Sequence, residues 1–246
     1  MWIVHRQEPF ASYGVFRKLH RISLAKWREL MNLGVPIGFA IFFETAVFAA
    51  VTLLMSRFDT LTIAAHQAAN NFASTLYMIP LSICLALTIL VGFETGAARL
   101  KDARQYAALG IGTAAAMALA TAILLMLFRQ GVAQLYSSEP EVVSLIKHFL
   151  VYAIFFQMSD AIATPTQGVL RGYKDVSPGF WISLLAYWII GLPLGFVLAN
   201  YTPQGPYGYW VGLITGLAVA AVLLLYRLVV IQRRLGSNQV HPADTP

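Results

Sequence analysis

The sequence predicts an all-α membrane protein with six transmembrane helices, and three observations support this fold class. The 246 residues are 58% hydrophobic and only 11% charged, whereas soluble domains carry about 25% charged residues. The mean hydropathy of +0.67 implies more apolar surface than one soluble core of this length could cover. The apolar residues also gather in six runs, each near the length of about 20 residues that a spanning helix needs.

The six runs follow one another with short polar segments between them. The predicted spans are about 33–55, 63–92, 106–128, 149–170, 179–199 and 208–230. The second is longer than a bilayer requires and contains Pro80, so we expect it to kink or tilt. Pro193 interrupts the fifth span. In the last span a glycine recurs every fourth residue from Gly208 to Gly216, a spacing that predicts close helix packing.

The membrane domain is predicted to cover residues 31–232, between two polar ends. Residues 1–30 are basic with apolar residues interleaved, which fits either a helix on the membrane surface or a solvated cytoplasmic linker. Residues 233–246 have the composition of a disordered cytoplasmic tail.

Lysine and arginine are unevenly divided between the two sets of loops. Fourteen lie before the first span, in the second-to-third and fourth-to-fifth loops, or at and beyond the tail-side end of the last span, and three lie in the alternate loops. Because cytoplasmic loops carry the excess of basic residues, both termini are predicted to be cytoplasmic. We therefore expect a multi-pass protein of the plasma (inner) membrane. The net charge of +6 is then explained by the lipid bilayer as partner, with no nucleic acid.

Two acidic residues fall in the middle of predicted spans. Glu44 is central in the first span and Asp160 lies near the middle of the fourth. A carboxylate at the centre of a spanning helix costs roughly 2.5–3.5 kcal/mol on insertion scales. One explanation is a site for a cation or a proton inside a polar cavity, and the alternative is a hydrogen bond between helices by a neutral acid. No transition-metal site is expected, whereas sodium can be held by these two carboxyl groups.

Uncharged polar residues form helical stripes near the acids. The fourth span carries polar residues at spacings of three and four, namely Gln157, Asp160, Thr164, Gln167 and Arg171. The second span carries another set, Gln67, Asn70, Asn71, Ser74 and Tyr77. Polar side chains can simply join helices, at about 0.6 kcal/mol per bond. Two stripes together with two acids favour a wet interior that these residues line.

Residues that would indicate an enzyme are missing from the sequence. His66 has no second nitrogen, thiolate or carboxylate at metal-ligand spacing. The sequence contains no HExxH, phosphate loop, paired-aspartate motif or serine nucleophile elbow. We therefore expect a protein that is not an enzyme and that uses no cofactor.

Five strings of the sequence carry a family resemblance. They are LGVPIGFAIFFETAVFA, AAHQAANNFASTLYMIPLSICLALTILVGFETGA, QMSDAIATPTQGVLRGYKD, AYWIIGLPLGFVLA and GYWVGLITGLAVAAVLLLYRL. In this order they resemble the C-terminal half of the multidrug and toxic compound extrusion (MATE) family, most closely its bacterial sodium-coupled drug-efflux branch. The similarity covers roughly residues 30–230. Leu90 stands where many members carry arginine.

The resemblance implies one six-helix lobe of a two-lobe transporter with a cavity between the lobes. Members exchange sodium or protons for drugs and other amphipathic organic cations. Glu44 and Asp160 correspond to cation-site residues of the C-terminal lobe, and Gln67, Asn70 and Asn71 to a cavity-facing helix. A second lobe, from a separate chain or a second copy, is therefore an expected partner, with sodium or a proton as coupling ion. The alternatives are a lobe of a related lipid or polysaccharide flippase, and an inactive fragment or structural membrane subunit.

Overall fold

The computed structural model describes residues 23–240, and the side chains of residues 23–236. The chain divides between Val35 and Pro36 into two parts, which are described separately. Throughout the described residues all regular structure is helical. Six segments are long and apolar enough to cross a membrane, so the predicted fold class is confirmed. The cytoplasmic placement of the termini stays a prediction.

The helices are longer than the predicted spans, and each predicted span lies inside one observed segment. Their bounds are α2 (Leu24–Met55), α3 (Thr60–Gly96), α4 (Leu100–Tyr136), α5 (Pro140–Gly172), α6 (Ser177–Leu184), η2 (Leu185–Gly191), α7 (Leu192–Tyr201) and α8 (Tyr207–Val240). The fifth span consists of α6, η2 and α7 in succession. Hydropathy locates only the part of a helix that is apolar, whereas hydrogen bonding continues into the polar turns at each end.

Helices extend into both polar ends of the chain. In the part that ends at Val35, residues from Leu24 onward are the first turns of α2, and residues 1–22 of the expected surface segment lie outside the described residues. At the other end, α8 continues to Val240, although a disordered tail was expected from residue 233. Residues 233–240 contain no proline, and Pro242 stands two residues after Val240, which fits a helix that ends before a proline.

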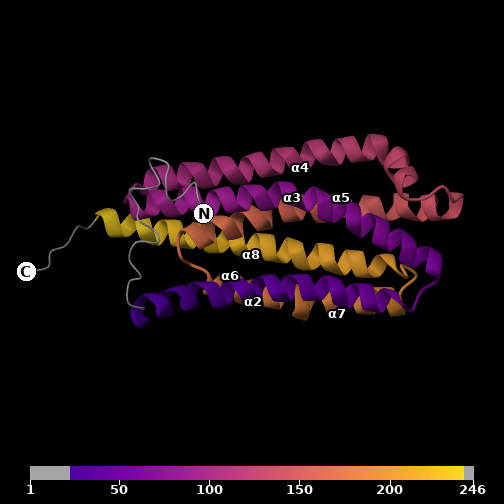
Figure 1. Ribbon diagram of the computed structural model, residues 1–246, viewed down its shortest axis with the longest axis horizontal. Coiled ribbons are helices and arrows are strands. Elements are labelled where there is room, and N and C mark those ends of the chain that lie inside the picture. The colour runs from indigo at the N-terminus through magenta and orange to yellow at the C-terminus, as the bar shows by residue number, and fades with distance from the viewer. Residues whose placement is uncertain (1–22, 241–246) are drawn as a thin grey trace, which may run out of the picture. The chain divides into compact units, whose positions relative to one another are not determined.

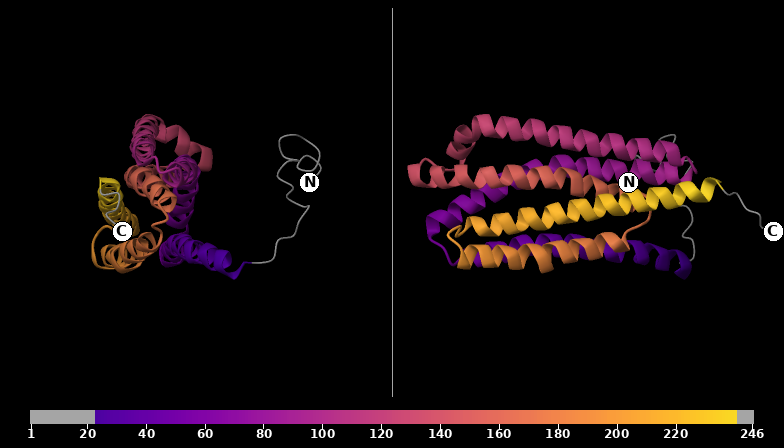
Figure 2. Two further views of the ribbon diagram at one scale, coloured as in Figure 1. Left: turned by 90° about the vertical axis from the view of Figure 1, so that its left-hand side faces the viewer. Right: turned by 180° about the vertical axis from the view of Figure 1, so that it is seen from behind.

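In the part that begins at Pro36, α5 occupies the centre. It packs beside α3, α4 and α8 (Figures 1 and 2), and most of its residues from Phe149 onward are buried. Figure 1 also shows α3 bending part-way along its length, and Pro80 lies inside this helix. A proline removes one backbone hydrogen bond and bends a helix at that point, which agrees with the predicted kink.

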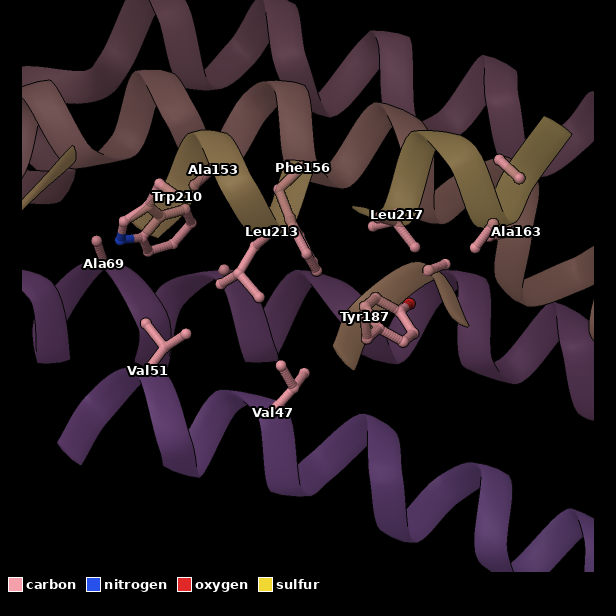
Figure 3. Close-up of a cluster of buried hydrophobic side chains, with 14 of the residues drawn as sticks. Val47, Val51, Ala69, Ala153, Phe156, Ala163, Tyr187, Trp210, Leu213 and Leu217 are labelled. Atoms are coloured by element: carbon pink, nitrogen blue, oxygen red, sulfur yellow. The ribbon is translucent and has the colours of Figure 1, made fainter. Parts of the chain in front are cut away.

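The apolar core lies between α8, α5 and the helices beside them. Figure 3 shows Val47 and Val51 directed from α2 toward the other helices, with Leu213, Trp210 and Phe156 in the same cluster. Over residues 36–55, α2 packs less closely against the other helices than α5 packs against α3, α4 and α8. A polar link also reaches α2, because the Trp188 indole N–H donates to the carbonyl oxygen of Phe43 at 3.0 Å. The looser packing leaves room beside α2.

Glycines allow the closest helix contacts, as the spacing in the last span predicts. A Cβ atom on Gly212 would lie 2.5 Å from the carbonyl oxygen of Gly191 and from Cα of Gly195. On α5, a Cβ atom at Gly168 would collide with the backbone carbonyl of Cys84. Real Cβ atoms do not come so close to backbone, so only glycine fits at these crossings.

The fifth span contains a π-helix that the sequence did not predict. The N–H of Leu192 bonds to the carbonyl of Tyr187, five residues earlier, at the end of η2. Pro193 follows at the start of α7 and has no N–H to donate to the preceding turn. Long helices often form the wider turns of a π-helix next to a missing backbone hydrogen bond.

Candidate functional site

A cavity of about 470 Å³ lies between α2, α3 and α5, with Trp210 of α8 in its wall. Its polar lining residues are Glu44, Thr45, Asn70, Ser74, Tyr77, Asp160, Thr164, Gln167 and Arg171. Apolar lining includes Phe48, Phe156 and Trp210. The volume falls within the range of small-molecule sites, and a mostly apolar wall with a few convergent polar groups is typical of them.

Asp160 is the most deeply buried acid of the cavity, with 1% of its surface exposed. The hydroxyl of Thr164, one turn later in α5, donates a hydrogen bond to Oδ1 at 2.7 Å. Oδ2 is buried and has no hydrogen-bond partner within the described part of the chain, and the same holds for Oε1 of Gln157 one turn earlier. A buried carboxylate oxygen without a partner is costly, so Asp160 has the chemistry to hold a cation or a proton.

Glu44 approaches the same cavity from α2. Asp160 and Arg171 line the same cavity. In one cavity the two carboxylates repel each other when both are ionised, and the positive charge of Arg171 attracts both. The Arg171 guanidinium in turn donates to the side-chain oxygen of Gln167 at 3.2 Å. With all three groups ionised, Glu44, Asp160 and Arg171 carry a net charge of minus one.

The structure brings together eight of the eleven residues that form the two polar stripes and the acid pair in the sequence analysis. These are Glu44, Asn70, Ser74, Tyr77, Asp160, Thr164, Gln167 and Arg171. Gln157 is buried in α5, but it is not part of the cavity lining. Gln67 and Asn71 are exposed on α3 and lie outside the lining. Asn71 instead accepts a hydrogen bond from the Tyr136 hydroxyl of α4 at 3.0 Å.

Trp210 was missed by the sequence analysis, and a buried histidine holds it in place. The Trp210 indole N–H donates to Nδ1 of His66 at 3.1 Å. The other ring nitrogen, Nε2, lies 3.5 Å from the Thr52 hydroxyl of α2. Acceptance at Nδ1 requires a neutral ring with its proton on Nε2. His66 therefore connects α2, α3 and α8 beside the cavity wall.

No metal cluster accompanies these groups. Within residues 23–236 there is no group of three or more histidine, cysteine, aspartate or glutamate side chains placed to hold a metal ion. The cavity places two carboxyl groups, Glu44 and Asp160, beside an aromatic wall, and carboxyl oxygens are groups that can bind a monovalent cation or a proton.

Comparison with known protein families shows which family this chain belongs to. The family model described as MatE matches residues 36–197, which is well over half of the 246 residues. The chain belongs to the MatE family. The resemblance found in the sequence is thereby confirmed, and the match covers the helices that supply Glu44 and Asp160.

Curated relatives of this MatE chain are bacterial proteins of about twice its length. A probable multidrug resistance protein NorM of Halalkalibacterium halodurans is 59% identical over 232 residues, which cover 94% of this chain and 51% of the relative. The protein of the same name from Bacillus subtilis is 53% identical over 238 residues, covering 97% and 53%. The chain thus spans about half the length of the curated relatives it matches, which is consistent with the expected half of a transporter.

Solved structures give the same affiliation. The crystal structure of the eukaryotic MATE transporter AtDTX14 matches with a TM-score of 0.82 and 26% identity, over 94% of this chain and 55% of that one. An outward-facing multidrug resistance MATE family transporter matches with a TM-score of 0.81 and 18% identity, over 90% and 50%. At the lower identity the second match supports the fold alone.

Proposed function

We propose that this MatE chain is one lobe of a cation-coupled antiporter that exports drugs and other amphipathic organic cations. The observation that carries the proposal is the meeting of two intramembrane carboxyl groups, Glu44 and Asp160, in one cavity. Acids at this depth are rare outside ion or proton pathways. The names of the curated relatives, which refer to multidrug resistance, support the export of drugs.

In this proposal, the charge of the cavity couples cation binding to the conformational change of the transporter. The cavity with Glu44, Asp160 and Arg171 ionised has a charge of minus one, so one sodium ion or one proton neutralises it. Neutralisation removes the mutual repulsion of the two carboxylates. A ligand drives a conformational cycle by binding one state better than another. Cation entry therefore favours one lobe arrangement, and release of the cation on the other side of the membrane favours the opposite one.

A second lobe, from a separate chain or a second copy, completes the transport pathway in this proposal. The curated relatives have about twice the length of this chain, and a pathway between lobes needs two walls. Leaving the polar groups of the cavity against lipid would cost roughly 1–3 kcal/mol for each group without a partner. We therefore expect efflux from the complete two-lobe protein and none from this chain alone.

A second candidate function is favoured by Arg171, which also lines the cavity. Arginine binds phosphate groups well, so a lobe of a flippase for anionic phosphate-bearing lipids would use such a residue. The two acids outnumber the single arginine in the lining, and they favour cationic cargo. The two candidate functions differ in substrate, which is an organic cation for the antiporter and an anionic lipid for the flippase.

Transport in proteoliposomes tests the proposal. The chain is co-expressed with the first lobe of a NorM relative, and efflux of ethidium is followed under a sodium or proton gradient. We expect efflux that depends on the gradient, and its loss with Asp160→Asn while membrane insertion is retained. Gradient-dependent efflux that Asp160→Asn leaves unchanged would refute the coupling role. Movement of a fluorescent anionic phospholipid without ethidium efflux would instead support the flippase.

A further inference from the structure

A second cavity lies at the end of the bundle where α4 begins and α8 ends, away from the carboxyl site. It has a volume of about 470 Å³ and is lined by Arg104, Val229, Gln232, Arg233 and Gly236. The Arg104 guanidinium donates a hydrogen bond to the backbone carbonyl of Gln232, which ties α4 to α8. This bond places the positive charge of Arg104 beside α8, within the same cavity as Arg233.

Among the described residues, the acids near this end of the bundle are paired with other arginines. Glu94 pairs with Arg99 at 2.5 Å. Asp175 accepts two hydrogen bonds from Arg227, at 2.6 and 2.8 Å. Over residues 23–236, neither Arg104 nor Arg233 has an acidic side chain at ion-pair distance. The cavity therefore presents two positive charges, and its ligand should be an anion.

An exposed apolar stripe continues from the cavity toward the middle of the membrane span. Val222, Tyr226, Val229, Arg233 and Gly236 follow one another at spacings of four and three along α8, so they share one helix face. The side chains of Val222, Tyr226 and Val229 are 65%, 69% and 44% exposed. The positive cavity and the apolar surface therefore lie along the same face of α8. A ligand with both an anionic group and an apolar chain would contact both.

We propose that this cavity binds the phosphate group of an anionic phospholipid, with one acyl chain along the stripe from Val229 to Val222. Arginine forms paired hydrogen bonds with phosphate oxygens, and basic pockets between transmembrane helices bind anionic lipid head groups. A free phosphate ion would use the two arginines but gain nothing from the apolar stripe. The lipid is therefore the occupant that matches both features.

Native mass spectrometry of the chain in detergent tests this site. The chain is titrated with phosphatidylglycerol, and with phosphatidylcholine as the zwitterionic comparison. We expect one phosphatidylglycerol to remain bound at concentrations where phosphatidylcholine does not. Arg104→Gln and Arg233→Gln should each weaken the binding about fivefold, from the attraction of one basic residue to an anionic lipid. Val222→Ser together with Val229→Ser should also weaken it.

Matched controls separate a site from a general charge effect. Arg129→Gln and Arg57→Gln each remove one exposed arginine outside this cavity and should leave the affinity unchanged. Arg104→Lys keeps the charge and should retain most of the binding, and circular dichroism verifies that each variant is folded. Equal weakening by Arg129→Gln would overturn the proposal. So would displacement of the lipid by equimolar inorganic phosphate, combined with no effect of the serine variants, because that pattern describes a free-phosphate site.

Discussion

The hydroxyl of Thr164 donates a hydrogen bond to Oδ1 of Asp160 at 2.7 Å. Both residues lie on α5 one turn apart, so the helix itself fixes the geometry of this pair. One carboxyl oxygen is thus held by the protein, and Oδ2 has no partner from the described residues. This division of the two oxygens is what we expect of a carboxyl that binds a cation or a proton with its second oxygen.

Replacing Thr164 should weaken sodium binding without unfolding the chain. Thr164→Val keeps the shape of the side chain and removes the donor that stabilises the ionised carboxyl, which is the form that binds sodium. Hydrogen bonds to charged groups contribute roughly 1.5–3 kcal/mol, so we expect the apparent sodium affinity to fall about tenfold. Thr166→Val is the control, because its hydroxyl donates to the Ile162 carbonyl in the same helix. Equal effects of the two variants would contradict this role of Thr164.

His66 should stabilise the chain through Trp210. In His66→Phe the indole N–H of Trp210 loses its acceptor in a buried position. A buried donor without a partner costs about 1–3 kcal/mol, which thermal unfolding followed by tryptophan fluorescence measures. His148→Phe serves as comparison, since this histidine is exposed and its ring contacts the Ser144 carbonyl of its own helix. An unfolding temperature that does not change in His66→Phe would argue against the network.

The contact between α8 and the fifth span should depend on glycine. Gly212→Ala places a Cβ atom 2.5 Å from backbone atoms of Gly191 and Gly195, and such overpacking costs about 1–3 kcal/mol. Gly112→Ala on α4 meets nothing within 4 Å and should be neutral or stabilising, because alanine favours a helix over glycine by about 1 kcal/mol. Thermal unfolding of both variants compares the two sites. A Gly212→Ala chain as stable as the parent would show that the helices can move apart freely.

The predicted orientation can be tested by labelling single cysteines. Cys84 is the one cysteine of the sequence and is buried, so background labelling should be low. Lys101→Cys, between the second and third spans, should react with a membrane-impermeant thiol reagent from the cytoplasmic side. Gln204→Cys, between the fifth and sixth spans, should react from outside. The physical reason is the excess of basic residues in the first set of loops, and the opposite labelling pattern would show an inverted insertion.

The sequence was sufficient to predict the helices and the acids of the candidate site, but not every face of α3. Asn70 and Asn71 are adjacent, and only Asn70 is part of the cavity lining. Asn70, Ala73, Ser74, Tyr77, Leu81 and Cys84 form the face that lines the cavity. Gln67 lies on the same face one turn before Asn70, outside the lining, whereas Asn71 is turned away from it. From the sequence alone, either asparagine can be placed toward the cavity, so the rotation of α3 about its own axis is uncertain by one residue. The packing of α3 against α5 decides it.

Aromatic lining could not be predicted from hydropathy. Phe48, Phe156 and Trp210 lie within apolar runs, where an aromatic residue does not differ from its neighbours in polarity. Whether such a residue faces lipid, core or cavity depends on the distance between helices, and α2 packs less closely against the other helices than α5 does. The π-helix η2 is equally hidden, because a proline predicts an interruption but not the form of the turns around it.

The most direct test of the central claim observes the two carboxyl groups themselves. Difference infrared spectroscopy of the purified chain in lipid, recorded on sodium addition and on a pH change, reports the protonation and cation binding of carboxyl side chains. We predict carboxyl bands that respond to sodium or pH, that disappear in Asp160→Asn and that are reduced in Glu44→Gln. Bands that are identical in the parent and in both variants would contradict the assignment of Glu44 and Asp160 as the cation site.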